Sequence, residues 1–257
     1  MSVKAKKHLG QHFLTDKNIC QKIANQYQKS RGCKKVLEIG PGMGALTEFL
    51  LKNDLDVWAM DVDTESIDYL KKNFPALEGK LLEADFLKAD LNALLGDEPI
   101  SVVGNFPYNI SSQILFKCID FRNQIPEIMG MFQREVAQRV AEPPGSKQYG
   151  ILSVLLQTYY DIDYCFTVDE HVFNPPPKVK SGVIRCVRND RDKLPCDEKL
   201  FKQLVKMSFN QRRKTIRNSI KPLIKGKGLD HEFLALRPEV LSVDQFIELT
   251  QLVASVI

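Results

Sequence analysis

The sequence predicts an α/β fold, a doubly wound and mostly parallel sheet, followed by a small all-α domain. Short apolar runs alternate with amphipathic stretches from Lys35 to about Met131, which is typical of βαβ units. Glycines follow the first of these runs, as in nucleotide-binding turns. Apolar residues recur at helical spacing after residue 190. The expected domains are therefore an α/β domain over 1–189 and a helical domain over 190–257.

The expected strands of the sheet are short apolar runs that end in turns. In chain order they are 36–39, 57–60, 81–82, 100–104 and 128–131. Helices are expected over 45–51 and over 64–73, with Thr64 as the cap of the second. Ligands of such sheets bind at the carboxyl ends of the strands, so the residues that follow each run are candidate site residues.

Beyond residue 135 the sequence predicts mainly helices and one late strand. Helical patterns run up to 140 and over 151–159, and the loop 142–146 separates them. A strand is expected over 179–187, and the charged segment 188–195 marks the domain boundary. A helix is expected over 200–209. Ser242 and Gln245 have capping-box spacing for a last helix that continues through Val253.

The composition is that of a soluble globular protein. The 257 residues are 44% hydrophobic and 26% charged, without an apolar run long enough for a membrane span. The first sixteen residues lack the apolar core of a secretory signal, so a cytoplasmic protein is expected. Six cysteines without a Cys-x-x-Cys pair predict free thiols in a reducing compartment. No metal site is expected.

The basic charge is concentrated in the C-terminal part. The net charge is +4, and residues 190–257 hold 13 Lys and Arg against 9 Asp and Glu, which leaves the remainder balanced. A one-sided basic excess is typical of nucleic-acid binding. The basic cluster has no interleaved acid and consists of Arg212, Arg213, Lys214, Arg217, Lys221, Lys225 and Lys227. We expect it to bind nucleic-acid phosphates in a salt-sensitive way. A second, mobile patch is expected at Lys4, Lys6 and Lys7.

Gly40, Gly42 and Gly44 follow the first strand and open a helix. Glycines let backbone amides approach a ligand that a Cβ would exclude. The Gly-Pro-Gly-x-Gly spacing differs from the Gly-x-Gly-x-x-Gly of dinucleotide sites, which serves a pyrophosphate. It suits S-adenosylmethionine, which has no phosphate. The alternative is an ordinary tight turn between a strand and a helix.

Two acids follow the next two strands. Asp61 is placed to accept hydrogen bonds from both ribose hydroxyls of a nucleoside cofactor, and Asp85 from its adenine amine. Without a ligand, these would be solvated surface acids.

Asn105-Phe106-Pro107-Tyr108 follows the 100–104 strand and suits an exocyclic amine. Such an amine is a poor nucleophile because its lone pair is delocalised into the ring. The Asn105 side-chain carbonyl and the Phe106 backbone carbonyl can accept its two N–H bonds and free the lone pair. Pro107 fixes the backbone and has no N–H, and Tyr108 offers a face for an extruded base. The pattern predicts methyl transfer to the amine of a base; the alternative is a plain Asn-Pro turn.

The chain resembles the small-subunit ribosomal RNA adenine dimethyltransferases, which are class I methyltransferases with a Rossmann-like fold. The resemblance rests on five segments, 10–14, 38–47, 105–108, 173–179 and 209–217. It implies dimethylation of two adjacent adenosines in a hairpin loop near the 3′ end of the small-subunit (16S) rRNA. S-adenosylmethionine would be the methyl donor and S-adenosylhomocysteine the product. The partner would be the 30S subunit, whose biogenesis the enzyme would serve, and the chain would be a monomer.

The resemblance also assigns site residues by position. His12 and Leu14 would close over the cofactor, and Gly40 would contact its methionine part. Glu38, Gly42 and Gly44 would also bind the cofactor, and Asn105 would lie between cofactor and target. Phe173 would form the aromatic wall opposite Tyr108; without the family, an ordinary core Phe would be expected. This chain departs from the usual family pattern at three of these positions, which are His12 for Asn, Asp61 for Glu and Phe106 for Leu.

Three other functions remain open from the sequence. An erythromycin-resistance type methylase acting on large-subunit RNA would share the catalytic core. A DNA adenine methyltransferase would need a larger target-recognition domain than this chain has room for. A ribosome-assembly factor that acts by binding would have no need of Asn105 or the glycines.

Overall fold

The computed structural model describes residues 3–28 and 33–257, which form two compact units. The first unit holds the described residues up to Ala137 together with Ile162–Arg188, and the second holds Gln138–Asp161 and Asn189–Ile257. The division predicted from the sequence, 1–189 and 190–257, differs in grouping 138–161 with the sheet. Residues 1–2 and 29–32 of the predicted first domain lie outside the described residues.

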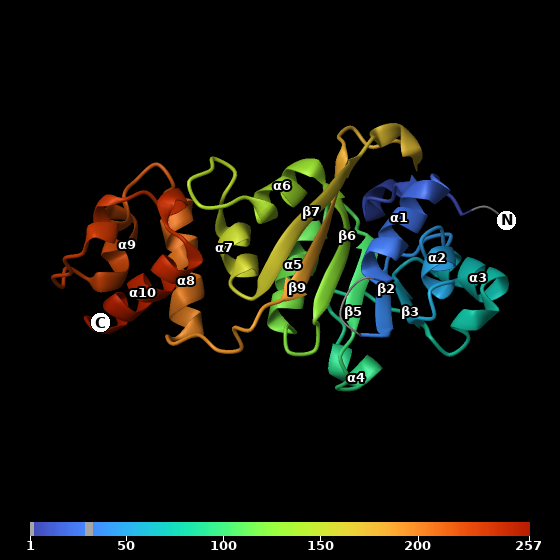
Figure 1. Ribbon diagram of the computed structural model, residues 1–257, viewed down its shortest axis with the longest axis horizontal. Helices are drawn as coiled ribbons and strands as arrows, with labels where there is room; N and C mark the ends of the chain where they lie inside the picture. The colour runs from blue at the N-terminus through green and yellow to red at the C-terminus, as the bar shows by residue number, and fades with distance from the viewer. Residues whose placement is uncertain (1–2, 29–32) are drawn as a thin grey trace. The chain divides into compact units, whose positions relative to one another are not determined.

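The first unit is built on a seven-stranded sheet with the order β4-β3-β2-β5-β6-β9-β7 (Figure 1). Its strands are β2 (Lys35–Ile39), β3 (Asp56–Asp61), β4 (Leu81–Glu83), β5 (Ser101–Asn105), β6 (Glu127–Gln133), β7 (Tyr160–Val168) and β9 (Ser181–Arg188). Neighbouring strands are parallel from β4 to β6, whereas β9 runs antiparallel to β6. The predicted doubly wound, mostly parallel sheet is confirmed, and the carboxyl ends of β2, β3, β4 and β5 meet at one edge.

The helices of this unit follow the strands. They are α1 (Lys17–Gln28), α2 (Thr47–Leu51), α3 (Thr64–Asn73), α4 (Leu91–Leu95), α5 (Ser111–Asp120) and α6 (Arg134–Ala141), which continues into the second unit. Helix α3 begins at Thr64 as predicted, but Thr64 as the cap is wrong. The cap is Asp63, whose carboxylate accepts the N–H of Glu65 at 3.1 Å. A carboxylate accepts this bond without a rotatable proton and also suits the positive end of the helix dipole.

Apolar side chains from α1 and α2 pack against the sheet and hold the strands in register. The core cluster includes Ile23 and Leu50 from these helices and Val36, Val57 and Val103 from the strands, all at most 1% exposed. Burial of each such side chain contributes about 1.5–3 kcal/mol. This packing makes the carboxyl edge of the sheet a fixed platform for loops.

A short ribbon adds the N-terminal segment to this edge. Strand β1 (Phe13–Leu14) pairs antiparallel with β8 (Phe173–Asn174), with Leu14 opposite Phe173. Short 3₁₀ turns η1 (Lys7–Leu9) and η3 (Glu170–Val172) precede the two strands, and η2 (Pro75–Leu77) follows α3. The chain start is therefore tied to a segment about 160 residues away, as the Thr15–Val172 backbone hydrogen bond also shows.

The second unit is helical. It contains α7 (Ile151–Gln157), α8 (Glu198–Asn210), α9 (Ile216–Ile224) and α10 (Val243–Ala254), with the 3₁₀ turns η4 (Glu232–Ala235) and η5 (Pro238–Val240). Tyr149, Phe209 and Phe246 form a chain of aromatic contacts with centroids 6.1 and 5.9 Å apart. The predicted capping box of the last helix is confirmed, because Ser242 and Gln245 each bond the other's backbone N–H.

Helix α7 ends two residues before its predicted limit, because β7 begins at Tyr160. Across 3–28 and 33–257, no helix combines the length and the apolar composition that crossing a bilayer requires.

Candidate active site

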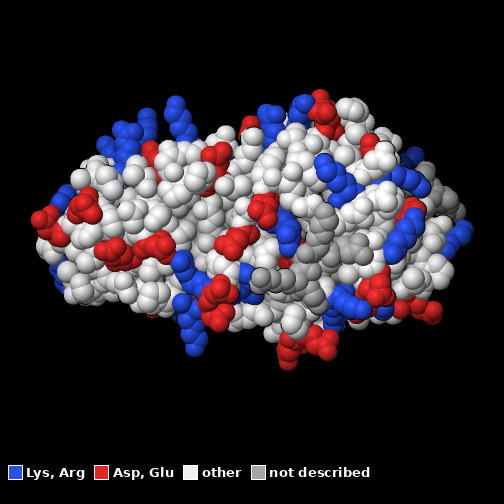
Figure 2. Space-filling model, viewed as in Figure 1, with Lys and Arg blue, Asp and Glu red and all other residues white. Residues whose placement is uncertain are grey.

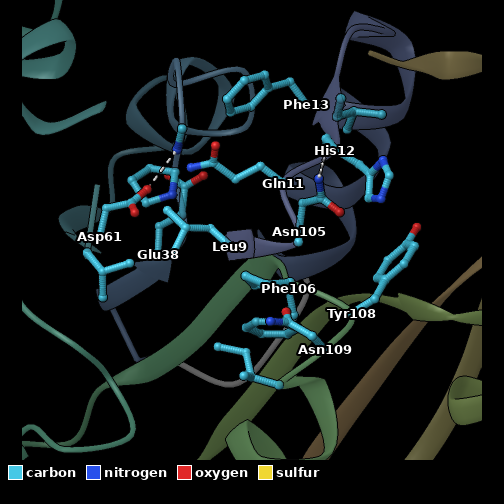
Figure 3. Close-up of a pocket in the computed structure, with 18 of the residues that line it drawn as sticks. Leu9, Gln11, His12, Phe13, Glu38, Asp61, Asn105, Phe106, Tyr108 and Asn109 are labelled. Carbon is cyan, nitrogen blue, oxygen red and sulfur yellow. Dashed lines mark hydrogen bonds between the residues drawn. The ribbon is translucent and has the colours of Figure 1, made fainter. Parts of the chain in front are cut away.

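A cavity of about 350 Å³ opens where β2, β3 and β5 end, a size within the range of small-molecule sites. Figure 3 shows Gln11, Glu38 and Asp61 around one part of it, and His12, Asn105 and Tyr108 around the other. We call the part lined by Glu38, Asp61 and Asp85 the acidic end, and the part around Asn105 and Tyr108 the amide end.

The glycine turn borders the acidic end with a backbone that favours glycine. Gly40, Gly42 and Gly44 all have positive φ, at 66°, 55° and 79°. A Cβ on Gly42 would lie 2.7 Å from the Phe13 ring, and one on Gly44 would lie 2.5 Å from the Phe74 ring. Gly40 and Gly42 line the cavity, whereas Gly44 is packed against Phe74, away from the lining.

Two carboxylates of the acidic end are buried and anchored. Glu38 is 2% exposed, and its Oε2 accepts the Thr47 hydroxyl at 2.6 Å. Burial raises the pKa of Glu38 to about 7. Asp61 is 7% exposed and accepts the backbone N–H of Asp63 at 3.0 Å and of Gly42 at 3.4 Å. Burial also raises the pKa of Asp61. Asp61, at the end of β3, thus joins the glycine turn to the backbone at Asp63 by hydrogen bonds.

Asp85 closes the acidic end and is more exposed. Its Oδ1 accepts the backbone N–H of Leu87 at 2.9 Å, and its Oδ2 lies 3.5 Å from Lys88 Nζ. With Glu38 and Asp61, it gives this end of the cavity three carboxylates. Such a lining attracts a cationic ligand and disfavours one that carries phosphates.

Asn105 has a fixed orientation at the amide end. Its Nδ2 donates to the backbone carbonyl of His12 at 2.8 Å, which leaves Oδ1 to accept from a ligand (Figure 3). The Phe106 ring is buried against Phe132, with centroids 4.8 Å apart. Gly130 makes room for that ring, because a Cβ there would lie 2.5 Å from it. Packing thereby fixes the backbone that carries Asn105.

Tyr108 is held at both its hydroxyl and its ring. The hydroxyl lies 2.5 Å from Ser181 Oγ. The ring stacks with that of His12, with centroids 5.5 Å apart and planes inclined by 29°. His12 Nδ1 in turn donates to the Pro175 carbonyl at 2.8 Å. In this structure the ring that faces Tyr108 is therefore that of His12.

Phe173 is not brought to the cavity lining. It is 3% exposed, lies in β8 opposite Leu14 and belongs to the core cluster. Its role as a wall opposite Tyr108 stays a prediction. The alternative expectation for this residue, an ordinary core Phe, agrees with its buried position in this structure.

The N-terminal segment supplies more of the lining than the sequence predicts. His12 and Leu14 line the cavity as expected, but so do Leu9, Gln11 and Phe13. Gln11 and Phe13 lie within the 10–14 segment that carries the family resemblance, whereas Leu9 lies just before it and carries no sequence signal. The predicted mobile patch is wrong for Lys6, whose Nζ lies 2.5 Å from Asp63 Oδ1.

The basic cluster lies at the end of α8 and along α9 in the second unit. Figure 2 shows Lys and Arg side chains gathered over this part of the unit. Arg213, Lys214 and Lys221 are exposed. Arg212 is half-buried and donates to the Ser146 carbonyl at 3.2 Å, and Arg217 pairs with Asp230 at 3.3 Å. Arg212 therefore also supports the unit's own structure.

The sheet, the glycine turn, the acids at Glu38, Asp61 and Asp85, and the asparagine at the end of β5 together define a class I S-adenosylmethionine-dependent methyltransferase. The model of the family described as "Ribosomal RNA adenine dimethylase" matches residues 2–250. The chain therefore belongs to the ribosomal RNA adenine dimethylase family, whose members methylate adenines of rRNA with S-adenosylmethionine as the donor. The predicted family, fold, enzyme class and cofactor are confirmed.

Relatives at high identity share nearly the whole chain. Two are "Ribosomal RNA small subunit methyltransferase A" of Parabacteroides distasonis and of Cytophaga hutchinsonii. The first is 57% identical over 251 residues, covering 96% of this chain and 93% of the relative. The second is 56% identical over 254 residues, covering 98% of both.

Two solved structures are similar over 93% of this chain. A dimethyladenosine transferase from Plasmodium falciparum is 26% identical with a TM-score of 0.75, and 96% of it is covered. The 23S rRNA methyltransferase ErmE is 25% identical with a TM-score of 0.65, and 99% of it is covered.

Proposed function

We propose that this protein dimethylates the N6 amines of two adjacent adenosines in a hairpin loop near the 3′ end of small-subunit rRNA. The relatives at 53–57% identity are named as small-subunit methyltransferases, which supports that substrate. The observation that carries the proposal is the Asn105 amide. Because His12 holds its N–H₂ group, the carbonyl oxygen is the part presented to an amine.

The residues of the acidic end fit S-adenosylmethionine. The cofactor supplies, when bound, an electrophilic methyl group on a positively charged sulfur and leaves as S-adenosylhomocysteine. Glu38 and the Gly40–Gly44 turn would hold its methionine part, and the turn offers the close backbone approach that a Cβ would block. Asp61 would accept the ribose hydroxyls and Asp85 the adenine amine. His12 and Leu14 would cover the cofactor from the N-terminal segment.

At the amide end we assign the target adenine. Asn105 Oδ1 and the Phe106 backbone carbonyl would each accept one N–H of the amine, which draws the nitrogen toward tetrahedral geometry. Neutral acceptors suit this work, since the methylated amine loses its proton readily and positioning matters more than a strong base. Pro107 fixes the turn and Tyr108 supplies a stacking face. Phe173, if it acts as the second wall, must leave the core to do so.

We further propose that the helical part binds the 30S subunit through rRNA phosphates, and that the protein serves subunit maturation. The exposed Arg213, Lys214 and Lys221, together with Arg217 and Arg212, support this role. We place the catalytic domain in 1–189 and the RNA-binding domain in 190–257, in a cytoplasmic and monomeric protein.

Tritiated methyl transfer to undermethylated small subunits tests the proposal, with large subunits in parallel and the product nucleoside identified by mass. We expect dimethyladenosine on the small subunit, lost with Asn105→Ala. Label on the large subunit would instead support the resistance-type activity. Absence of label on both, with the protein still bound to small subunits, would support a binding factor.

A further inference from the structure

Residues 6–14, which we call the strap, run along the cavity and supply much of its wall. His8, Leu9, Gln11, Phe13 and Leu14 all line it. The cavity is therefore complete only when the strap lies against the sheet edge. The contacts described next hold the strap in that position.

One end of the strap is fastened to a single carboxylate, that of Asp63. Lys6 Nζ lies 2.5 Å from Oδ1, and Gln11 Nε2 donates to Oδ2 at 2.9 Å. The Lys6 backbone N–H also donates to Gln11 Oε1 at 2.8 Å, so the two donors are tied to each other. Lys6 also lies 3.1 Å from Glu65. Each oxygen of Asp63 thus holds a different residue of the strap.

Asp63 is suited to act as a fixed anchor. Its side chain is fully buried, and it also accepts the N–H of Glu65 at 3.1 Å and the hydroxyl of Ser66 at 3.2 Å. Burial tends to raise the pKa of Asp63, but the hydrogen bonds from Gln11 and Lys6 hold it below its ordinary value. A buried carboxylate is costly without partners, so loss of the strap donors is unfavourable.

The anchor belongs to the turn that carries Asp61. The Asp63 N–H donates to Asp61 Oδ1 at 3.0 Å, and Asp61 Oδ2 accepts from Gly42. Fastening the strap to Asp63 therefore fastens it to the frame of the acidic end. The Phe13 ring lies over Gly42, where a Cβ would come within 2.7 Å of it.

The other end of the strap reaches the amide end. The His12 carbonyl accepts from Asn105 Nδ2 at 2.8 Å, and His12 Nδ1 bonds the Pro175 carbonyl. The position of His12 thus determines how the Asn105 amide is turned. A strap released at Asp63 would loosen both the cofactor wall and this hydrogen bond.

We propose that Lys6, Gln11 and Asp63 form a latch that holds the strap closed over the bound methyl donor. They are positioning residues, since they act through the strap rather than on the reacting atoms. The latch rests on the proposed function in taking S-adenosylmethionine as the ligand of the acidic end. The strength of the latch determines the dissociation rate of the donor and how well the orientation of the Asn105 amide is fixed.

Lys6→Met tests the latch, because it removes the charge and the donors of Nζ but keeps the apolar stem. Loss of a charge-assisted hydrogen bond predicts dissociation of S-adenosylmethionine about tenfold faster. KM for the donor should rise by a similar factor, and kcat at saturating donor should fall by less than about threefold. Hydrogen exchange at the strap amides should speed up in the unliganded protein.

Matched variants separate the latch from a purely structural role. Lys6→Arg keeps the charge and should restore dissociation to within about twofold of wild type. Lys7→Met alters an exposed neighbour in the strap and should leave the rate unchanged. Gln11→Ala removes the second arm and should speed dissociation by about threefold. Asp63→Asn also alters the cap of α3, so Lys6 and Gln11 carry the test.

Binding of S-adenosylmethionine is measured without RNA. A negative result for the latch is therefore distinct from a negative result for the proposed rRNA substrate. Lys6→Met and Gln11→Ala with wild-type dissociation rates and wild-type exchange would overturn the latch alone. A folded wild-type protein that binds no S-adenosylmethionine would overturn the cofactor assignment and the latch together.

Discussion

The two ends of the cavity differ in the chemistry of their polar groups. The acidic end presents three carboxylates, two of them buried and anchored by Thr47 or backbone N–H groups. The amide end presents an amide, a phenol and an imidazole, each fixed by a neighbour. Carboxylates suit a ligand that carries a positive charge, whereas neutral acceptors suit an amine that must keep its lone pair. The contrast indicates that binding and chemistry depend on separate residues.

The largest expected effect is on the reaction rate and comes from the amide end. Asn105→Ala should lower single-turnover methyl transfer by at least about 100-fold, the size of loss seen when one positioned polar group is removed from an active site. Asn92→Ala changes an exposed asparagine of α4 that does not line the cavity and is the matched control, expected to retain activity. Equal losses in the two variants would contradict a specific role for Asn105.

At the acidic end, the next largest effect should fall on donor affinity. Gly42→Ala adds a Cβ that strikes the Phe13 ring and strains a positive φ, so S-adenosylmethionine affinity should fall at least about tenfold. Gly79→Ala has a similar φ of 74° with nothing within 4 Å of its Cβ. Both variants should lose about 1–2 kcal/mol of stability, but only the first should lose affinity in calorimetric titration.

Glu38 predicts a pH dependence specific to the acidic end. Its pKa is raised to about 7 in the folded chain, so its contribution to stability is fully present below the unfolded-state pKa. That contribution, about 1–3 kcal/mol, is lost as the pH rises through 7. Urea unfolding from pH 5 to 8.5 should show this decline in wild type and less of it in Glu38→Gln. Bound S-adenosylmethionine should reduce the decline, since a cation favours the ionised carboxylate. Parallel profiles of the two unliganded proteins would contradict the assignment.

The smallest expected effect concerns rRNA affinity. Arg213→Ala with Lys214→Ala should weaken rRNA binding by about threefold at moderate salt and reduce the slope of log affinity against log salt by about 1.5. Lys199→Ala with Lys206→Ala removes two exposed lysines from α8, outside the cluster, and is the control. Filter binding across a salt series measures both. Equal slopes for all three proteins would argue against the cluster.

The sequence predicted the parallel part of the sheet because its strands are buried on both faces and read as apolar runs. It did not predict β7, where acids such as Asp161 and Asp163 interrupt the apolar pattern. This strand is at the edge of the sheet, and several of its residues are exposed or half-buried. The helix predicted over 151–159 therefore runs up to the start of that strand, two residues past the end of α7.

The site was predictable where a motif lies at or directly after the end of a strand, as at Gly40, Asp61 and Asn105. It was not predictable where long-range pairing decides which side chains meet. Pairing of β1 with β8 buries Phe173 and brings the His12 ring to Tyr108. The Lys6–Asp63 contact joins residues 57 positions apart, and a lysine near the chain start carries no local sign of its partner.

The most direct test of the two-ended cavity measures S-adenosylmethionine affinity and single-turnover methyl transfer on the same preparations of Asn105→Ala and Gly42→Ala. We predict a crossed result. Asn105→Ala should bind the donor within about fivefold of wild type yet transfer methyl groups at least about 100-fold more slowly. Gly42→Ala should bind weakly yet recover most of the rate at saturating donor. If both variants lost affinity and rate in proportion, binding and chemistry would not be separable between the two ends.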